Sequence, residues 1–149
     1  RLAFYMENFL NTFKPKQVNK KNWVINIPME EKPLDLFCCQ DLGGIVLKMF
    51  DNPNEWIGKG IGVAGDSLTG TQIAELFTLY TGIDHYYKPV SVEDFKKQRI
   101  QGAIELGNMF AFYQQFAGKL RDVKRTREIY PETLDFRSWL ELNAGAFKG

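Results

Sequence analysis

The amino-acid sequence predicts an α/β fold organised as one module over residues 1–149. Short runs of β-forming residues alternate along the chain with stretches whose apolar residues recur at helical spacing. No repeat, low-complexity tract or long linker divides the chain, and its 149 residues are enough to bury one core. The predicted helices outweigh the predicted strands, which are few and short for a self-standing sheet.

The first third of the chain is expected to form a strand end, a helix, two strands and a second helix. Arg1-Leu2 has the composition of the last residues of a strand, and a short helix follows over residues 5–13 until a proline ends it. Runs of β-forming residues then predict strands over residues 23–27 and 34–38. Residues 40–41 open a helix that carries the apolar stripe of a half-buried helix.

The rest of the chain continues this alternation. Residues 51–54 (DNPN) predict a turn, and Gly60–Gly65 predicts a buried strand. Thr69 is expected to cap a helix that ends at Gly82. The remaining expected elements are a strand over residues 85–90, a short helix from Ser91, a long helix over 103–120 and a last element from residue 130.

The net charge argues against a nucleic-acid partner, and the lengths of the apolar runs argue against a membrane partner. Nineteen basic residues against eighteen acidic ones leave a net charge of +1, so the chain has no overall field that attracts nucleic acid. No apolar run approaches the roughly 20 residues that a membrane helix needs. We therefore expect no direct nucleic-acid partner and no membrane partner, and we expect a protein of the cytoplasm.

The cysteines and the histidine do not indicate a metal site. Cys38 and Cys39 are adjacent, and adjacent cysteines rarely reach a comfortable disulfide geometry. Since there is no second cluster of Cys and His residues, zinc binding is not expected. The single histidine, His85, could act as a general acid or base. No partner residue flanks it at the spacing of a triad, so we interpret it as a strand histidine near the surface.

Gly60–Gly65 (GIGVAG) matches the Gly-x-Gly-x-x-Gly pattern that cradles the pyrophosphate of a dinucleotide. Asp84 follows about 20 residues later, where a ribose-binding acid is expected. The context differs, because a phosphate loop follows an apolar strand, whereas residues 52–56 (NPNEW) precede the first glycine. We interpret the glycines as a strand packed tightly against its neighbours, with a nucleotide loop as the alternative.

Two further stretches have ordinary interpretations. Residues 119–127 (KLRDVKRTR) concentrate five basic residues; without interleaved aromatic residues we interpret them as a solvated helix face. The aromatic residues over 110–116 are expected to lie mostly in the core, with a crevice wall or a protein interface as the alternative for the rest. No tyrosine is followed by lysine at the Tyr-x-x-x-Lys spacing that a short-chain reductase uses, so no catalytic residue is assigned.

Several short segments occur along the chain in an order and at spacings that together form a fairly specific pattern. They are Arg1-Leu2 with Tyr5-x-Glu7-Asn8, Asp41-Leu42-Gly43, Ile61-Gly62, Val92-Glu93-Asp94-Phe95, the stretch over residues 105–113 (ELGNMFAFY), and Thr133-Leu134-Asp135-Phe136-x-x-Trp139-Leu140. Together these segments resemble the C-terminal half of NmrA-like family proteins, which are atypical relatives of the short-chain dehydrogenases. The resemblance covers nearly the whole chain.

The resemblance implies the C-terminal portion of a Rossmann-like NAD(P)-binding fold with a mostly helical subdomain. The family's glycine-rich phosphate loop and most of its parallel sheet precede the point in the family pattern at which this chain begins. We therefore expect a fragment or the product of a truncated gene. The implied cofactor is NADP(H), and the family segment that matches Tyr5, Met6, Glu7 and Asn8 lies beside its nicotinamide end. These four residues are the predicted cofactor-binding residues.

The resemblance implies two functions. The leading hypothesis is non-enzymatic: the partner- and ligand-facing part of an NADP(H)-responsive redox sensor and regulatory protein. Its expected partner is a regulatory protein, with a homodimer and a second location in the nucleus as alternatives. The rival hypothesis is an NAD(P)H-dependent reductase of quinones or similar small molecules, with substrate in the crevice between the Tyr5 region and the aromatic helix at Phe110. A truncated product without activity is the third hypothesis.

Overall fold

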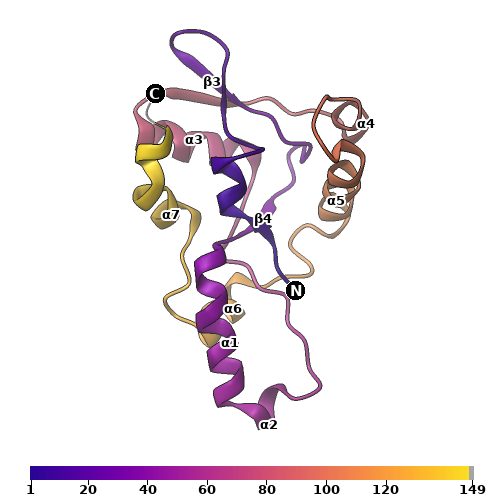
Figure 1. The fold of residues 1–149 in the computed structure, drawn as a ribbon, viewed down its shortest axis with the longest axis vertical. Helices are drawn as coiled ribbons and strands as arrows, with labels where there is room; N and C mark the ends of the chain where they lie inside the picture. Colours follow the sequence, from indigo (N-terminus) through magenta and orange to yellow (C-terminus); the bar gives the residue numbers. More distant parts are fainter. Residues whose placement is uncertain (148–149) are drawn as a thin grey trace.

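Helices surround two small sheets in the computed structural model, which describes residues 1–147 (Figure 1). The first sheet has the strand order β1-β4-β5. Its central strand β4 (Leu34–Phe37) is parallel to β1 (Phe4–Tyr5) and antiparallel to β5 (Asp66–Leu68). All four residues of β4 are buried, so this strand is covered on both faces and forms the centre of the sheet.

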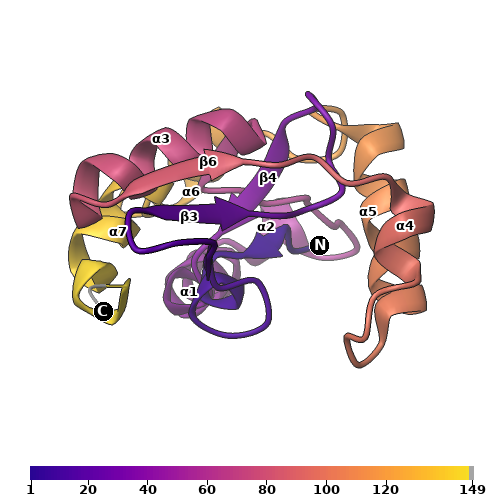
Figure 2. The same ribbon diagram turned by 90° about the horizontal axis from the view of Figure 1, so that it is seen from above.

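The second sheet has the strand order β2-β3-β6. Strand β3 (Asn22–Ile25) is antiparallel to β2 (Lys16–Gln17) and parallel to β6 (Asp84–Tyr87). Figure 2 shows β3 and β6 side by side, with a long helix over residues 70–81 alongside β6. The connection between β3 and β6 contains that helix, as expected for parallel strands that need a long crossover.

The helices flank the sheets on three sides. In chain order they are α1 (Leu42–Asp51), α2 (Pro53–Trp56), α3 (Gly70–Thr81), α4 (Val92–Lys96), α5 (Ala103–Phe116), α6 (Val123–Ile129) and α7 (Phe136–Asn143), with short 3-10 turns η1 (Met6–Leu10), η2 (Cys39–Asp41) and η3 (Ala144–Phe147). Helices α4 and α5 pack together on one side, and α7 packs on α3 at the other, while α1 and α2 extend away from both (Figure 1). Within residues 1–147, no helix combines the length and the hydropathy needed to cross a membrane.

Local sequence explains where several helices begin and end. The Thr69 side chain accepts a hydrogen bond from the Gln72 backbone N–H at 3.3 Å, and the Gln72 side chain accepts one from the Thr69 N–H at 2.9 Å. This reciprocal capping box fixes the start of α3. Gly82 ends the helix in the left-handed region, with φ of 71°. Both predicted ends of this helix are confirmed.

The main core is built largely from aromatic rings. Phe9 lies at its centre, with ring centroids 5.6 Å from Phe4, 5.6 Å from Phe77 and 5.4 Å from Phe136. These rings come from η1, β1, α3 and α7, so they connect the first sheet to helices α3 and α7. Edge-to-face and tilted arrangements of this kind add to the free energy of burial.

Several predicted boundaries differ from the structure in the first half of the chain. The first strand is formed by Phe4–Tyr5 and not by Arg1-Leu2, which lie outside it. Of the helix expected over residues 5–13, only residues 6–10 are helical, as the 3-10 turn η1. The strand expected over residues 23–27 is β3, which spans Asn22–Ile25. The expected turn over residues 51–54 holds the start of α2, because Pro53 has the backbone angle that suits the first position of a helix. Residues 60–65 form no strand, although residues 63–65 are buried as predicted.

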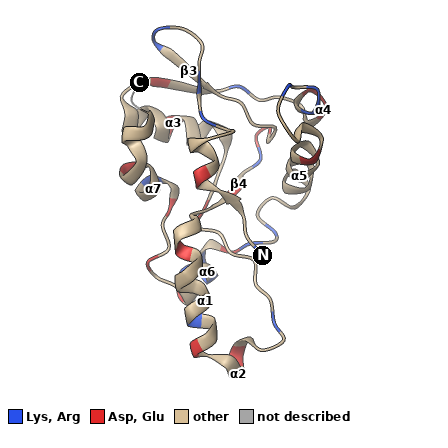
Figure 3. Ribbon diagram, viewed as in Figure 1, with Lys and Arg blue, Asp and Glu red and all other residues tan. Residues whose placement is uncertain are grey.

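Three boundaries differ in the second half. The strand expected over residues 85–90 is β6, which spans Asp84–Tyr87 and so ends three residues earlier. The long helix expected over residues 103–120 stops at Phe116, because Ala117 leaves the helical conformation and Gly118 takes a positive φ of 67°. The last element starts at Phe136 rather than at residue 130, since Asp135 supplies its N-cap by accepting from the Ser138 N–H at 2.7 Å. Charged residues of both signs are spread along the elements (Figure 3).

Candidate functional site

A hollow of about 370 Å³ lies between β1 and α5. It is lined by Leu2, Ala3, Phe4, Tyr5, Asn8, Met109 and Tyr113. None of these residues carries a charge at neutral pH, and their mixture of apolar surface with a few polar groups is typical of small-molecule sites. The predicted crevice between the Tyr5 region and the aromatic helix therefore exists. Its wall on α5 is made by Met109 and Tyr113, whereas Phe110 is fully buried in the core.

The structure brings two of the four predicted cofactor-binding residues into this hollow. Tyr5 is 37% exposed and Asn8 is half-buried, and both line the hollow. Met6 is 0% exposed and packs in the aromatic core, so only its backbone could meet a ligand. Because η1 is a 3-10 turn that starts directly after Tyr5, Tyr5 and Asn8 lie three residues apart on the same side of the chain.

Glu7, the fourth predicted residue, points toward the two cysteines. Its Oε1 accepts hydrogen bonds from the Cys38 thiol at 3.3 Å and from the Cys39 backbone N–H at 3.1 Å. Its Oε2 is buried without a hydrogen-bond partner among residues 1–147. This oxygen lacks the hydrogen bond that buried polar atoms normally have, and Glu7 is not part of the lining of the hollow.

Both cysteines are free; Cys38 is buried and Cys39 is exposed. Burial raises the pKa of Cys38 to about 12, and the hydrogen bond to Glu7 adds to the rise. Desolvation and Glu7 together raise the pKa of Cys39 to about 11. Both thiols are therefore protonated at neutral pH, and neither is the thiolate that redox or nucleophilic chemistry needs.

Arg121 stands behind the hollow and was missed by sequence reasoning. Its Nε and one terminal nitrogen donate to the Leu2 carbonyl oxygen at 3.1 and 2.7 Å, and its other terminal nitrogen lies 3.7 Å from the Asp35 carboxylate. The side chains of Arg121 and Asp35 are only 9% and 6% exposed. The interpretation of residues 119–127 as a solvated face is therefore wrong for Arg121. The available signal was Asp35, an acid inside an apolar strand, which implies a buried cationic partner.

Arg121 also contacts Tyr113 of the hollow. The guanidinium carbon lies 5.2 Å from the centroid of the Tyr113 ring, within the range of a cation–π contact. Burial raises the pKa of Tyr113, while the positive charge of Arg121 acts in the opposite direction. The phenol is therefore protonated at neutral pH and can donate a hydrogen bond.

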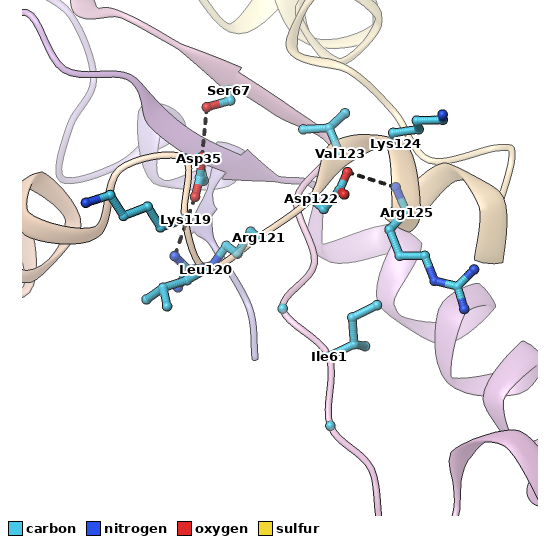
Figure 4. A pocket seen from close by; sticks show the side chains of 13 residues that line it. Asp35, Ile61, Ser67, Lys119, Leu120, Arg121, Asp122, Val123, Lys124 and Arg125 are labelled. Atoms are coloured by element: carbon cyan, nitrogen blue, oxygen red, sulfur yellow. Dashed lines mark hydrogen bonds and ion pairs between the residues drawn. The ribbon is translucent and has the colours of Figure 1, made fainter.

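A second pocket, of about 600 Å³, lies on the other side of Arg121 (Figure 4). Charged side chains dominate its lining: Asp35, Lys119, Arg121, Asp122, Lys124 and Arg125. Most of these charges already have partners. Ser67 donates to Asp35 at 2.8 Å, and Arg125 pairs with Glu55 and Glu128 at 2.8 and 3.0 Å. Ion pairs therefore hold Asp35, Arg121 and Arg125 of this pocket in place.

The glycine-rich segment over residues 60–65 borders this second pocket. The Val63 N–H donates to the Arg1 carbonyl oxygen at 3.0 Å, and the Gly65 N–H donates to the Leu36 carbonyl oxygen at 2.7 Å. A Cβ atom on Gly62 would overlap the carbonyl oxygen of Leu120. These N–H groups are thus used internally, and β5 follows rather than a helix. The interpretation as a tightly packed segment is confirmed, whereas the expected strand is not formed.

His85 lies away from the hollow and is more buried than expected. It is 9% exposed, and its ring stacks on Phe77 at 5.3 Å. Burial lowers its pKa, and Nδ1 lies 2.7 Å from the Ile83 carbonyl oxygen, as in a neutral ring that donates from Nδ1. Its predicted position near the surface is wrong, because α3 covers β6. No group of three potential metal ligands occurs in the described part of the chain.

A family model and a curated protein that resemble this chain both carry the name of the NmrA-like family. A model of the NmrA-like family matches residues 1–140. An NmrA-like family domain-containing protein of Dictyostelium discoideum is 24% identical over 118 residues, which is 77% of this chain and 38% of that protein.

Solved structures match the fold with low sequence identity. Nmra, described as a negative transcriptional regulator in complex with NADP, has a TM-score of 0.73 and 17% identity over 94% of this chain and 50% of its own. An NADPH-dependent quinone oxidoreductase of Escherichia coli, complexed with NADPH, has a TM-score of 0.69 and 18% identity over 96% of this chain and 52% of its own. The chain thus spans about half the length of these proteins, and the predicted Rossmann-like α/β class is confirmed.

Proposed function

Because this chain belongs to the NmrA-like family, we propose that it is the partner- and ligand-facing part of an NADP(H)-responsive regulatory protein. The position of Tyr5 and Asn8 carries this proposal. Tyr5 is the last residue of β1, Asn8 lies in the turn that follows it, and both line the hollow. Ligands of open α/β sheets bind at the carboxyl ends of strands. A structural neighbour described as a transcriptional regulator in complex with NADP supports the same direction.

Residues 5–8 fit the nicotinamide end of a dinucleotide. The Asn8 amide, in the lining of the hollow, offers both a donor and an acceptor. A carboxamide group needs partners of both kinds. Glu7 lies next to Asn8 in sequence, with its Oε2 buried and unpartnered among residues 1–147, outside that lining. The bound cofactor would supply a hydride or accept one at its nicotinamide ring. The role of this chain is to orient that ring and to shield it with the apolar wall of the hollow.

The turn η1 connects this site to the helices that would present a surface to a partner. Met6 and Phe9 of η1 are buried, and Phe9 touches the rings of Phe77 on α3 and Phe136 on α7. A shift of η1 would therefore change the packing of both α3 and α7. Oxidised and reduced cofactor can change the partner surface only if they bind its two states with different affinity.

Amide hydrogen exchange tests the proposal, measured on the longest natural polypeptide in which this chain occurs. NADP⁺ and NADPH should protect residues 5–10 to different extents, with a difference that extends into α3 and α7. Asn8→Ala should weaken the response, whereas Asn54→Ala, at an exposed position of α2, should leave it unchanged. Identical exchange with both forms of the cofactor would contradict a redox-responsive role.

The partner and the compartment are part of the same proposal. We expect a regulatory protein partner, with a second copy of this chain as the alternative. Sedimentation of the purified chain separates these two, since only self-association depends on its own concentration. A cytoplasmic location, with the nucleus as a second compartment, is tested by imaging a tagged chain in cells.

A second candidate function is an NADPH-dependent reductase of quinones or similar compounds. The hollow favours it, because neutral walls and two phenol groups suit an uncharged ring compound. A structural neighbour described as an NADPH-dependent quinone oxidoreductase points the same way. Quinone-dependent consumption of NADPH by the same polypeptide would select the reductase. Cofactor binding without turnover would select the regulator.

A further inference from the structure

We infer that the hollow binds a neutral ring compound whose carbonyl oxygen accepts a hydrogen bond from the Tyr113 hydroxyl, and that Arg121 is the positioning residue for Tyr113. This inference rests on the proposed function only in taking the hollow as the ligand site. It adds to the uncharged ring compound of the second candidate function the residue that recognises its carbonyl group, Tyr113, and the residue that positions it, Arg121.

The lining of the hollow selects a neutral and largely flat ligand. All seven lining residues are uncharged, so a carboxylate or phosphate would lose its hydration without gaining an ionic partner. Tyr5, Tyr113 and the thioether of Met109 provide surfaces that pack well against a ring. The volume of about 370 Å³ is at the lower end of ligand pockets and suits a compound of one or two rings.

Tyr113 is the lining residue best prepared to recognise a carbonyl group. Its ring is fixed on α5 by edge contact with Phe110, whose centroid lies 6.2 Å away. Among residues 1–147, no hydrogen bond contributes to the pKa of its hydroxyl, which is raised by burial. By contrast, the Tyr87 hydroxyl donates to the Ile27 carbonyl oxygen at 2.9 Å and is not free. The Tyr113 hydroxyl therefore has a donor to offer a ligand.

Arg121 acts on the ligand through Tyr113. Its guanidinium is held on one side by the Leu2 carbonyl oxygen and on the other by Asp35. In this position its guanidinium carbon lies 5.2 Å from the centroid of the Tyr113 ring, and this cation–π contact holds the ring in place. Arg121 is absent from the lining of the hollow, so its effect on binding depends on the hydroxyl of Tyr113.

Equilibrium dialysis of the chain with duroquinone and durene tests the inference. Both probes have one ring with four methyl groups, and only duroquinone has carbonyl oxygens. Because its ring positions are all substituted, duroquinone also resists addition by the exposed Cys39 thiol. Tyr113→Phe should lower the affinity for duroquinone about fivefold, the effect of one net hydrogen bond. The affinity for durene should not change.

Tyr86→Phe is the matched control, because Tyr86 is exposed on β6 and lies outside the hollow. It should change neither affinity. Equal losses for both probes in Tyr113→Phe, or no loss for either, would overturn the hydrogen bond. Failure of duroquinone to bind the wild-type chain would overturn the assignment of the hollow.

Arg121→Lys tests the positioning role, since lysine keeps a charge beside Asp35 but loses the planar group over the ring. It should weaken duroquinone binding in the wild-type background and have no effect in the Tyr113→Phe background. Equal losses in both backgrounds would show a merely structural role. Dialysis needs no nucleotide, so its outcome is independent of the exchange experiment. Duroquinone binding without a cofactor response would reject the regulatory function and keep the hollow as a ligand site.

Discussion

Replacement of Gly62 by alanine tests the interpretation of the glycine-rich segment. The added methyl group would overlap the carbonyl oxygen of Leu120, and it would lie 3.1 Å from the Cγ of Arg121. A backbone oxygen cannot rotate away, so the chain must shift, at a cost of about 1–3 kcal/mol. Alanine also lowers the conformational entropy of the unfolded chain, which stabilises the folded state by about 0.4–1 kcal/mol. We expect the free energy of unfolding to fall by about 1–2 kcal/mol.

Urea denaturation of Gly62→Ala measures this change as a lower midpoint at an unchanged slope. In thermal unfolding, Tm should fall by roughly 2–4 °C for each kcal/mol. Gly60→Ala is the matched control, because a Cβ at that position meets nothing within 4 Å, and it should be neutral or slightly stabilising. A Gly62→Ala chain with wild-type stability but lost dinucleotide binding would refute the packing argument in favour of a phosphate loop.

Three further substitutions test other parts of the account. Thr69→Ala removes one half of the capping box of α3 and should lower the free energy of unfolding by about 1 kcal/mol; an unchanged urea midpoint would contradict this. Burial lowers the pKa of His85 below its ordinary value of 6.5, so the unfolded chain binds a proton more readily, and stability should fall as the pH drops below about 6.5. His85→Gln should make the unfolding midpoint less sensitive to pH in that range, and an unchanged sensitivity would contradict the account. Arg121→Met leaves the Asp35 carboxylate buried without its cation and should cost about 3–5 kcal/mol. Adding Asp35→Asn should restore part of this loss in the same denaturation assay, whereas additive losses would show that the two residues are not coupled.

Features that depend on neighbouring residues were predictable from sequence. Both ends of α3 follow from local chemistry, because Thr69 and Gln72 cap each other and Gly82 takes the left-handed conformation. The hollow could also be predicted, since the resemblance placed Tyr5 at a strand end and the helical spacing gave α5 an aromatic face.

Features that depend on distant contacts were not predictable in the same way. Arg121 lies in a basic run typical of a solvated surface, and only tertiary structure brings it to Asp35 and Leu2. His85 is buried because α3 packs against β6, and a strand pattern alone does not reveal this contact. The glycine-rich segment has the composition of a strand but pairs through only a few hydrogen bonds.

The central claim is that this chain meets NADP(H) through residues 5–8 and not through its glycine-rich segment. An NMR titration of the ¹⁵N-labelled chain with NADPH at millimolar concentration tests it most directly. The account predicts that the largest amide shifts occur at residues 5–8 and along the α5 wall of the hollow. Shifts concentrated at residues 60–65, or none at residues 5–8, would contradict it.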